Sequence, residues 1–110
     1  MSAKTSRIPD AVRKHVRERD RGCVGPRAGL PGKCRGGPLE QNHIRPSHGI
    51  GMKSPSTADN LVSLCAWVHH RWATEHGPEA RPLLIAWVDK AEAAIASART
   101  RVGTYNVAAE

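Results

Sequence analysis

Residues 22–38 place the strongest limit on how this chain can fold, because nine of these seventeen residues are Gly or Pro. Glycine weakens helices and strands, and proline lacks the backbone N–H that both need, so regular secondary structure is not expected here. A segment of this composition is ordered only where something holds it. Cys23 and Cys34 lie near its two ends, where they are placed to anchor the loop.

A third cysteine, Cys65, lies four residues before His69 and five before His70. Three cysteines cannot all pair, and the N-terminus lacks the apolar core of a signal peptide, so a cytoplasmic chain without disulfides is expected. Structural zinc sites use four Cys or His ligands. We therefore predict that Cys23, Cys34, Cys65 and one histidine bind a structural Zn²⁺. The alternative is three buried free thiols, which would leave the loop unanchored.

The choice of histidine follows from helical spacing. Residues four apart lie on one face of a helix, whereas the next residue is rotated by about 100°. The spacing therefore favours His69 as the ligand that acts with Cys65, and it leaves His70 for another function. The reverse assignment stays open.

Length, composition and charge limit the remaining possibilities. A chain of 110 residues with no Phe, three Trp and one Tyr can build one small core, which a bound metal commonly reinforces. No apolar run is long enough to cross a membrane. The net charge is +7, and residues 1–37 carry the whole excess, with ten Lys or Arg against three acids. This asymmetry indicates a polyanionic partner, although a solubilising surface would have the same composition.

Hydrophobic spacing predicts one domain over residues 8–98, with its zinc framework and core over about 22–77. A helix is expected from Pro9 to Asp20, where apolar residues recur at every fourth position, and a strand from Pro38 to Ile44. A second extended run is expected over Asn60–Leu64.

Two more helices are predicted in the second half of the chain. The first runs from about Cys65 to Glu75 and is broken by Gly77-Pro78. The second covers Pro82–Ser97, and its apolar face packs on the core or, alternatively, on a partner. Segments without regular structure are expected at residues 1–7, 45–59 and 99–110, the first and last of them flexible.

Two stretches, LEQNHIRP and DNLVSLCAWVHH, contain His43, Asn60 and His70 in that order within the predicted metal framework. This ordered series resembles the HNH nucleases, and the resemblance covers about residues 8–77. It implies an α+β fold with a ββα-metal (His-Me finger) core, stapled by zinc and flanked by N- and C-terminal helices. Small basic chains of this type are similar to nucleases encoded by bacteriophages and actinobacteria.

The resemblance also implies a role for each motif residue. His43 corresponds to the general base, and Asn60 to the residue that holds the loop through backbone hydrogen bonds. Asn42 and His70 correspond to the ligands of a catalytic divalent ion such as Mg²⁺, Mn²⁺ or Ni²⁺. The expected activity is endonuclease cleavage of DNA, double-stranded in the first instance, and a phage packaging terminase is a partner that the resemblance admits. The candidate nucleic-acid contacts are Arg13, Lys14, Arg17, Arg45, Lys53 and Arg71.

The chain departs from the HNH pattern at two places. In relatives, this segment commonly consists of a Cys, two further residues, a second Cys and then His. Here three residues follow Cys65, and the second zinc ligand would be a histidine, His69. Asn42 stands where many relatives have Asp or His, and a neutral amide is a poorer ligand for a hard cation. This second departure favours an alternative, a zinc-stabilised DNA-binding module with little or no activity. A purely structural or protein-binding zinc domain is a third alternative, which gives the His–Asn–His series no role.

Overall fold

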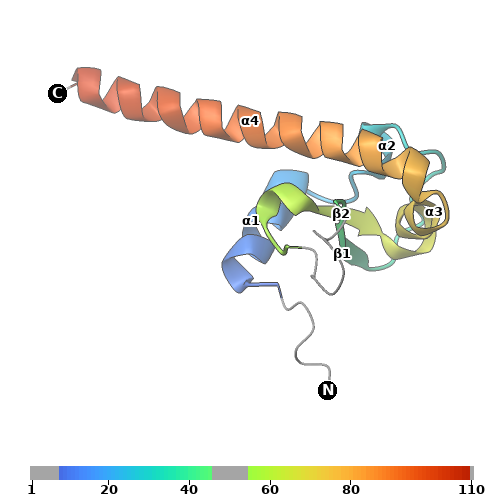
Figure 1. Ribbon diagram of the computed structural model, residues 1–110. Coiled ribbons are helices and arrows are strands. Elements are labelled where there is room, and N and C mark those ends of the chain that lie inside the picture. Colours follow the sequence, from blue (N-terminus) through green and yellow to red (C-terminus); the bar gives the residue numbers. More distant parts are fainter. Residues whose placement is uncertain (1–7, 46–54, 110) are drawn as a thin grey trace.

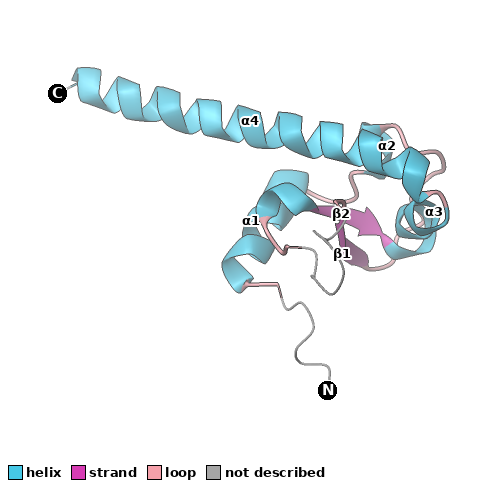
Figure 2. Ribbon diagram, viewed as in Figure 1, coloured by secondary structure: helices cyan, strands magenta, loops and turns pink. Residues whose placement is uncertain are grey.

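The computed structural model describes residues 8–45 and 55–109, with side chains up to residue 100. Within these ranges the chain is a small α+β fold, as predicted, with a two-stranded antiparallel sheet packed among helices (Figures 1 and 2). The predictions for residues 1–7, for most of the 45–59 loop and for Lys53 lie outside the described residues.

The first helix, α1 (Asp10–Asp20), agrees with the predicted helix to within one residue. Pro9 precedes it, where a missing N–H breaks no helical bond, and the Pro9 carbonyl accepts the N–H of Arg13. The helix ends where Arg21 adopts a left-handed conformation (φ 51°) and donates its N–H to the carbonyl of Arg17. The chain then turns directly into the Gly/Pro-rich segment.

Part of that segment is helical, which corrects the prediction that residues 22–38 contain no regular structure. α2 (Gly25–Ala28) is a single turn with proline in its first turn, and Gly29 ends it with a positive φ of 97° that favours glycine. Val24 and Leu30 flank this turn and are buried in the core. Tertiary burial at both ends therefore stabilises a turn that composition alone does not predict.

The sheet forms where the two extended runs are predicted. β1 (Leu39–His43) pairs antiparallel with β2 (Leu61–Cys65), so that His43 lies opposite Leu61, and the 3-10 turn η1 (Ala58–Asn60) leads into β2. Every residue of β2 is buried, whereas β1 is exposed at its start and half-buried toward its end. β2 therefore lies inside the fold, and β1 presents polar side chains near the surface.

The segment after β2 is helical as predicted, although it is wound in two forms. η2 (Ala66–His70) is a turn of π-helix, and α3 (Arg71–Glu75) continues it as α-helix. At His76 the backbone leaves the helical region (φ −125°, ψ 47°), which ends α3 just before the predicted Gly77-Pro78 break.

The last helix is longer than predicted at both ends. α4 (Gly77–Ala109) begins before Pro82, because the N–H groups of Glu79 and Ala80 bond to the His76 carbonyl and start the helix earlier. It also continues through residues 99–109, which the sequence predicts to be flexible, since no proline follows Pro82 to end it. In Figure 1, α4 crosses the whole molecule, and its C-terminal part extends beyond the other elements.

α4 covers the core with the first half of its predicted apolar face. Leu84 and Val88 are buried with Ile44 and Val62 in one hydrophobic cluster, whereas Ala94 is exposed. Core packing of this helix is therefore observed near its N-terminal end. Among the described residues, none of the helices combines the length and the apolar character that a membrane crossing requires.

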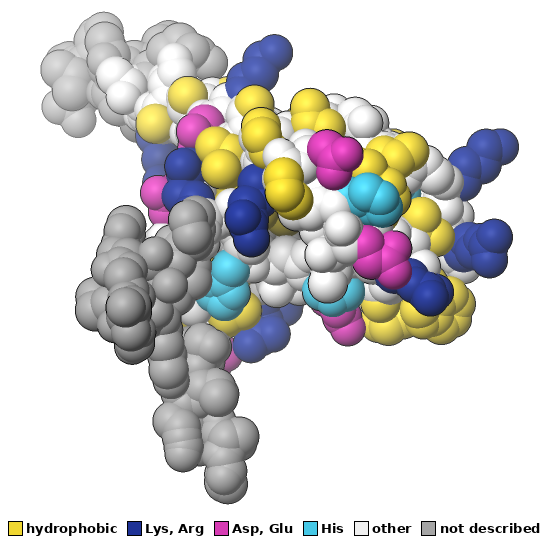
Figure 3. Space-filling view, turned by 45° about the vertical axis from the view of Figure 1, so that its right-hand side comes forward, with side chains coloured by type: hydrophobic (Ala, Val, Ile, Leu, Met, Phe, Trp, Pro, Cys, Tyr) yellow, Lys and Arg dark blue, Asp and Glu magenta, His cyan; other side chains and the backbone are white. Residues whose placement is uncertain are grey.

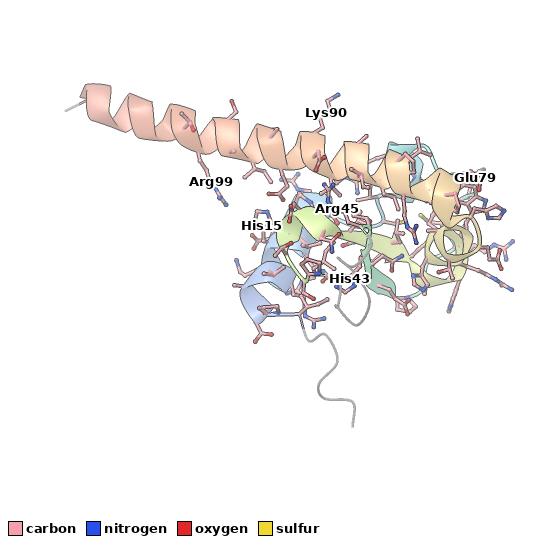
Figure 4. All side chains as sticks on the ribbon, in the orientation of Figure 1. His15, His43, Arg45, Glu79, Lys90 and Arg99 are labelled. Carbon is pink, nitrogen blue, oxygen red and sulfur yellow. The ribbon has the colours of Figure 1, made fainter. Side chains whose placement is uncertain are left out.

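Buried charged side chains join α1 to α4 and to the sheet. The Arg19 guanidinium is 2% exposed and lies 2.6 Å from Asp20 and 2.9 Å from Glu92 on α4. His15 contacts the same Glu92 oxygen (2.7 Å) from the side of α1 that faces α4 (Figure 4). Asp20 also accepts the backbone N–H of Ser63 in β2. Because each buried charge has a partner, the network avoids the large cost of an unpaired one.

Candidate metal centre and active-site cleft

Cys23, Cys34, Cys65 and His69 come together in one group, whose ligand atoms all lie within 4.8 Å of one another. The three sulfurs lie 3.3, 3.6 and 3.2 Å from His69 Nδ1, in chain order. Tetrahedral zinc, with bonds of about 2.3 Å to sulfur and 2.0–2.1 Å to nitrogen, would separate these atoms by about 3.5 Å. This Cys3His cluster could therefore hold a metal ion, and its donors fit zinc.

Four different segments supply the cluster. Cys23 follows α1, Cys34 lies in the Gly/Pro-rich loop, Cys65 ends β2 and His69 lies in η2. Gly25 at the start of α2 packs directly on the His69 ring, and a methyl group at Gly25 would overlap that ring. The glycine therefore lets the loop approach closely enough for its two cysteines to reach the cluster.

Hydrogen bonds around the cluster orient its ligands. His69 Nε2 lies 3.0 Å from the carbonyl of Gly32, so an Nε2–H donates to that oxygen and leaves the Nδ1 lone pair toward the sulfurs. The backbone N–H groups of Cys65 and Gly25 donate to Cys23 Sγ at 3.2 and 3.4 Å, and the N–H of His69 donates to Cys65 Sγ at 3.4 Å. Donors aimed at sulfur stabilise thiolates, which are the form that binds metal.

The pKa values of two thiols of the cluster are shifted in opposite directions. Burial alone would raise the pKa of Cys65, but hydrogen bonds from His69 and the nearby Cys23 lower that pKa to about 7. Burial, together with Cys23 and Cys65, raises the pKa of Cys34 to about 11. Crowded sulfurs cannot all carry negative charge by themselves, and a divalent cation is what would hold all three as thiolates. None of the three cysteines forms a disulfide.

His70 lies outside the cluster, although it is next to His69 in sequence. Its Nδ1 lies 2.7 Å from Asn42 Oδ1, and its Nε2 lies 3.2 Å from a carboxylate oxygen of Glu40. Glu40 and Asn42 are two apart on β1, so they share a face of the strand and flank the ring together. The two predicted divalent-ion ligands, Asn42 and His70, are thus in direct contact. Glu40 was not predicted, although its spacing from Asn42 was a usable signal.

A cleft of about 430 Å³ opens beside this group, between β1, the η2–α3 helix and α4. Asn42, His43 and His70 line it, and α4 contributes Arg81 to the lining. Arg81 was also missed, because nothing local in the sequence relates α4 to β1. We call this the His43–His70 cleft.

His43 and Asn60 are held by different partners. His43 Nε2 lies 3.1 Å from the Ser56 hydroxyl, and His43 lies at the end of β1 (Figure 4). Asn60 is buried; its amide oxygen accepts the N–H of Arg45 at 2.8 Å, and its amide nitrogen donates to the carbonyl of Pro55 at 2.6 Å. Asn60 thus makes the backbone hydrogen bonds expected of it, and they join the residues on either side of segment 46–54.

The structure divides the predicted nucleic-acid contacts. Arg13 and Arg17 of α1 are exposed, and both line a hollow whose other side includes Glu40 of β1. Lys14 is exposed and pairs with Glu18 at 2.6 Å. Arg45, by contrast, lies between η1 and α4, where it bonds to Asp89 at 2.6 Å (Figure 4), and Arg71 is exposed near Glu75 at 3.7 Å. Arg13, Lys14 and Arg17 are thus exposed on α1, although Lys14 has an acidic partner, and Arg45 links the segment after β1 to α4 through its own.

No protein-family profile, curated protein or solved structure matches this chain. The likeness to HNH nucleases therefore rests on the motif residues themselves.

Proposed function

We propose that this chain is a metal-dependent endonuclease of the HNH type that hydrolyses phosphodiester bonds of DNA, with its Cys3His cluster binding a structural Zn²⁺. One observation carries the proposal: Asn42 and His43 at the end of β1 and the sequence-distant His70 of η2 line a single cleft, to which α4 contributes Arg81. The β1–β2–η2 succession that supplies these residues is compatible with a ββα-metal core.

His43 is the general base in this proposal. An imidazole that is neutral near pH 7 accepts a proton from the attacking water, and it needs only one of its two ring nitrogens to do so. The Ser56 hydroxyl at 3.1 Å fixes the other nitrogen and so orients the ring. Asn60 is a positioning residue, because its bonds to Arg45 and Pro55 hold the backbone next to His43.

Asn42 and His70 hold the catalytic divalent ion, which would stabilise negative charge on the phosphate and on the leaving oxygen. Glu40 makes this pair better suited to bind a divalent ion than the neutral amide of Asn42 alone would suggest. When it accepts the Nε2–H of His70, it leaves Nδ1, beside the Asn42 oxygen, as the ring nitrogen that would bind the ion, an arrangement common around metal-binding histidines.

Arginine side chains in the cleft and in a separate hollow beside α1 suit a nucleic-acid backbone. Arg81 lies on the cleft wall and can pair with a phosphate oxygen, as arginine does through two parallel N–H groups. Arg13 and Arg17 of α1 line a hollow with Glu40 and Gln41 of β1, and Gln41 also lines the cleft, so a duplex bound at α1 would lie near β1. Binding through such contacts is independent of base sequence and sensitive to salt.

The alternative is a DNA-binding module that has lost its activity. Asn42 favours it, because a neutral amide in place of a carboxylate weakens a hard-cation site. The alternative retains the Cys3His cluster and the basic surface but requires no turnover.

Plasmid cleavage separates the two. Purified protein is incubated with supercoiled plasmid in Mg²⁺, Mn²⁺ or Ni²⁺, beside His43→Ala and the matched control His76→Ala, whose ring stacks on Trp72 outside the cleft. We expect His43→Ala to lose about 10²–10⁴-fold in rate while it binds DNA normally, and His76→Ala to cut like the wild type. If the wild type cuts nothing with any ion, or His43→Ala cuts equally well, the nuclease proposal is wrong.

A further inference from the structure

A second recess lies on the loop side of the molecule, away from the His43–His70 cleft. It has a volume of about 800 Å³ and runs between the Gly/Pro-rich loop and the η2–α3 helix. A hollow of this size is large enough for a nucleotide, since pockets for drug-sized molecules measure about 300–1,000 Å³. Lys33, Arg35, Trp67, Arg71 and Trp72 line it, and we call it the Trp67 groove.

Trp67 is the most exposed large hydrophobic side chain in the described part of the chain, at 59%. Its ring is nevertheless fixed. A Cβ at Gly37 would lie 3.0–3.1 Å from three atoms around the fused bond of the indole, so the glycine backbone covers one face of the ring. Gly37 also has a positive φ of 84°, which a larger residue would adopt with strain. The loop therefore supports an indole that is otherwise largely exposed.

Cations surround this ring. Lys33 and Arg35 are exposed on the loop, and Arg71 is exposed on the first turn of α3. The only acid among the groove residues is Glu75, which lies 3.7 Å from Arg71 and is itself 58% exposed, a geometry that contributes little. Figure 3 shows Lys and Arg side chains projecting beside hydrophobic ones at the α3 end of the molecule. The groove therefore combines net positive charge with a rigid aromatic face.

We propose that the Trp67 groove binds single-stranded nucleic acid, with one base stacked on Trp67 and the neighbouring phosphates paired with Lys33, Arg35 and Arg71. Stacking on aromatic rings within a positively charged groove is how proteins bind single strands without reading sequence. A duplex cannot use the indole in this way, because each base face inside it is already covered by its neighbours. The groove thus selects an unpaired segment.

An exposed tryptophan beside cations can also bind an anionic membrane surface. The shape argues against it, because a lone indole seated in a recess on a glycine loop offers little apolar area to insert among acyl chains. This inference rests on the proposed function only in taking nucleic acid as the partner. It adds that an unpaired stretch of that nucleic acid binds at a surface separate from the His43–His70 cleft.

The test is equilibrium binding of a fluorescein-labelled oligo(dT) to the zinc-loaded full chain, without added divalent ion so that cleavage does not interfere. A blunt duplex of equal length and vesicles of phosphatidylserine and phosphatidylcholine are the other two ligands. Trp67→Ala should weaken oligo(dT) binding roughly 5- to 150-fold, because base stacking contributes about that much, and should leave duplex affinity nearly unchanged. Trp67→Phe should restore part of the loss.

Matched controls come from α4. Leu83→Ala removes another exposed apolar side chain (40% exposed), and Lys90→Ala removes a cation that points away from the domain (Figure 4). Both should bind oligo(dT) like the wild type, whereas Lys33→Ala with Arg35→Ala should bind weakly. Circular dichroism and zinc content establish that each variant is folded.

The outcomes separate this inference from the nuclease proposal. A protein that cuts plasmid but whose oligo(dT) affinity is unchanged in Trp67→Ala overturns the groove and leaves the nuclease intact. A protein that cuts nothing but loses oligo(dT) binding in Trp67→Ala supports the groove alone. Loss of vesicle binding in Trp67→Ala, with oligo(dT) binding unchanged, would assign the groove to membranes and overturn the inference.

Discussion

The two histidines of the adjacent pair His69–His70 serve two sites of opposite character. His69 is fully buried in the Cys3His cluster, whose four ligands face one another and whose remaining polar atoms bond to backbone. His70 is 37% exposed at its side chain and is shared between Asn42 and Glu40 at the edge of a cleft. One peptide bond therefore separates a closed set of soft ligands from an open set of harder ones.

The difference indicates what each site can do. A closed tetrahedral set leaves no position for a substrate, so an ion there contributes stability by joining distant segments. An open set of oxygen and nitrogen ligands leaves coordination positions for water and phosphate, so an ion there is exchangeable and suited to chemistry. Removal of the ion from the Cys3His cluster should accordingly unfold the chain. Removal of the ion from the cleft should only stop turnover.

The largest expected effect comes from the Cys3His cluster. Cys65→Ser, or removal of the ion by a chelator, should unfold most of the chain, because bound structural zinc contributes about 10 kcal/mol or more, comparable to the whole stability of a small domain. Metal analysis and thermal melting followed by circular dichroism measure this. His70→Ala is the matched control and should retain both zinc and the wild-type melting temperature. Identical melting of the wild type with and without chelator would contradict the structural role of the metal.

A smaller, opposite pair of effects is expected at the cleft. Glu40→Gln weakens the acceptor that orients His70, so the divalent-ion concentration for half-maximal cleavage should rise about 10- to 100-fold. Asn42→Asp supplies a charged oxygen of the kind that hard cations prefer, so that concentration should fall.

Cleavage rates measured across a Mg²⁺ or Mn²⁺ titration test both changes. Glu79→Gln, an exposed carboxylate in the first turn of α4 (Figure 4), is the control and should behave as the wild type. Zinc content should not change in any of the three. The assignment of the ion to Asn42 and His70 fails if neither cleft substitution moves the metal requirement.

The sequence predicted the cluster better than the cleft, and the reason is physical. Cys65 and His69 are only four residues apart, so they meet even though Cys65 ends β2 and η2 is a π-helical turn. A loop rich in Gly and Pro needs an anchor whatever surrounds it. The cleft depends on tertiary approach. Arg81 reaches it only because α4 begins at Gly77 and crosses β1, which residues near Arg81 do not encode.

Other features that the sequence did not predict have the same origin. Arg45 stays a predicted phosphate contact by its position after His43, but the fold also brings Asp89 of α4 to it. The α2 turn exists because Val24 and Leu30 are buried on either side of it, and burial is decided by the rest of the chain.

A third effect should alter DNA binding and leave both metal sites unchanged. Replacing Arg13, Lys14 and Arg17 with Ala removes three exposed cations of α1 and should weaken binding to every sequence alike. The slope of log affinity against log salt should become shallower by about 2 to 3 units, since each lost phosphate contact releases about one counterion fewer. Fluorescence anisotropy at several salt concentrations measures the slope. Lys90→Ala with Arg99→Ala is the control, and an unchanged slope in the triple variant would place the binding surface elsewhere.

The smallest expected effect concerns the support of α4, which forms one wall of the cleft but supplies no ligand to the cluster. Glu92 bonds to Arg19 and His15, and although burial opposes the shift, these partners lower the pKa of Glu92. Glu92→Gln should therefore reduce the free energy of unfolding by about 1 kcal/mol, a value between exposed and buried pairs. Zinc content should not change.

The pH dependence of that loss identifies which partner is responsible. A carboxylate whose pKa is lower in the folded state stabilises the fold fully above its ordinary value of 4.5 and loses the effect only as pH falls through the lowered pKa. The difference between Glu92→Gln and wild type in urea unfolding should thus be the same at pH 7 and pH 5.5, provided that Arg19, charged at both, is the main partner. A difference that changes between the two pH values would show instead that Arg19 is not the main partner. The constant difference is the expected result, since Arg19 is nearly fully buried against Glu92 and His15 is 25% exposed.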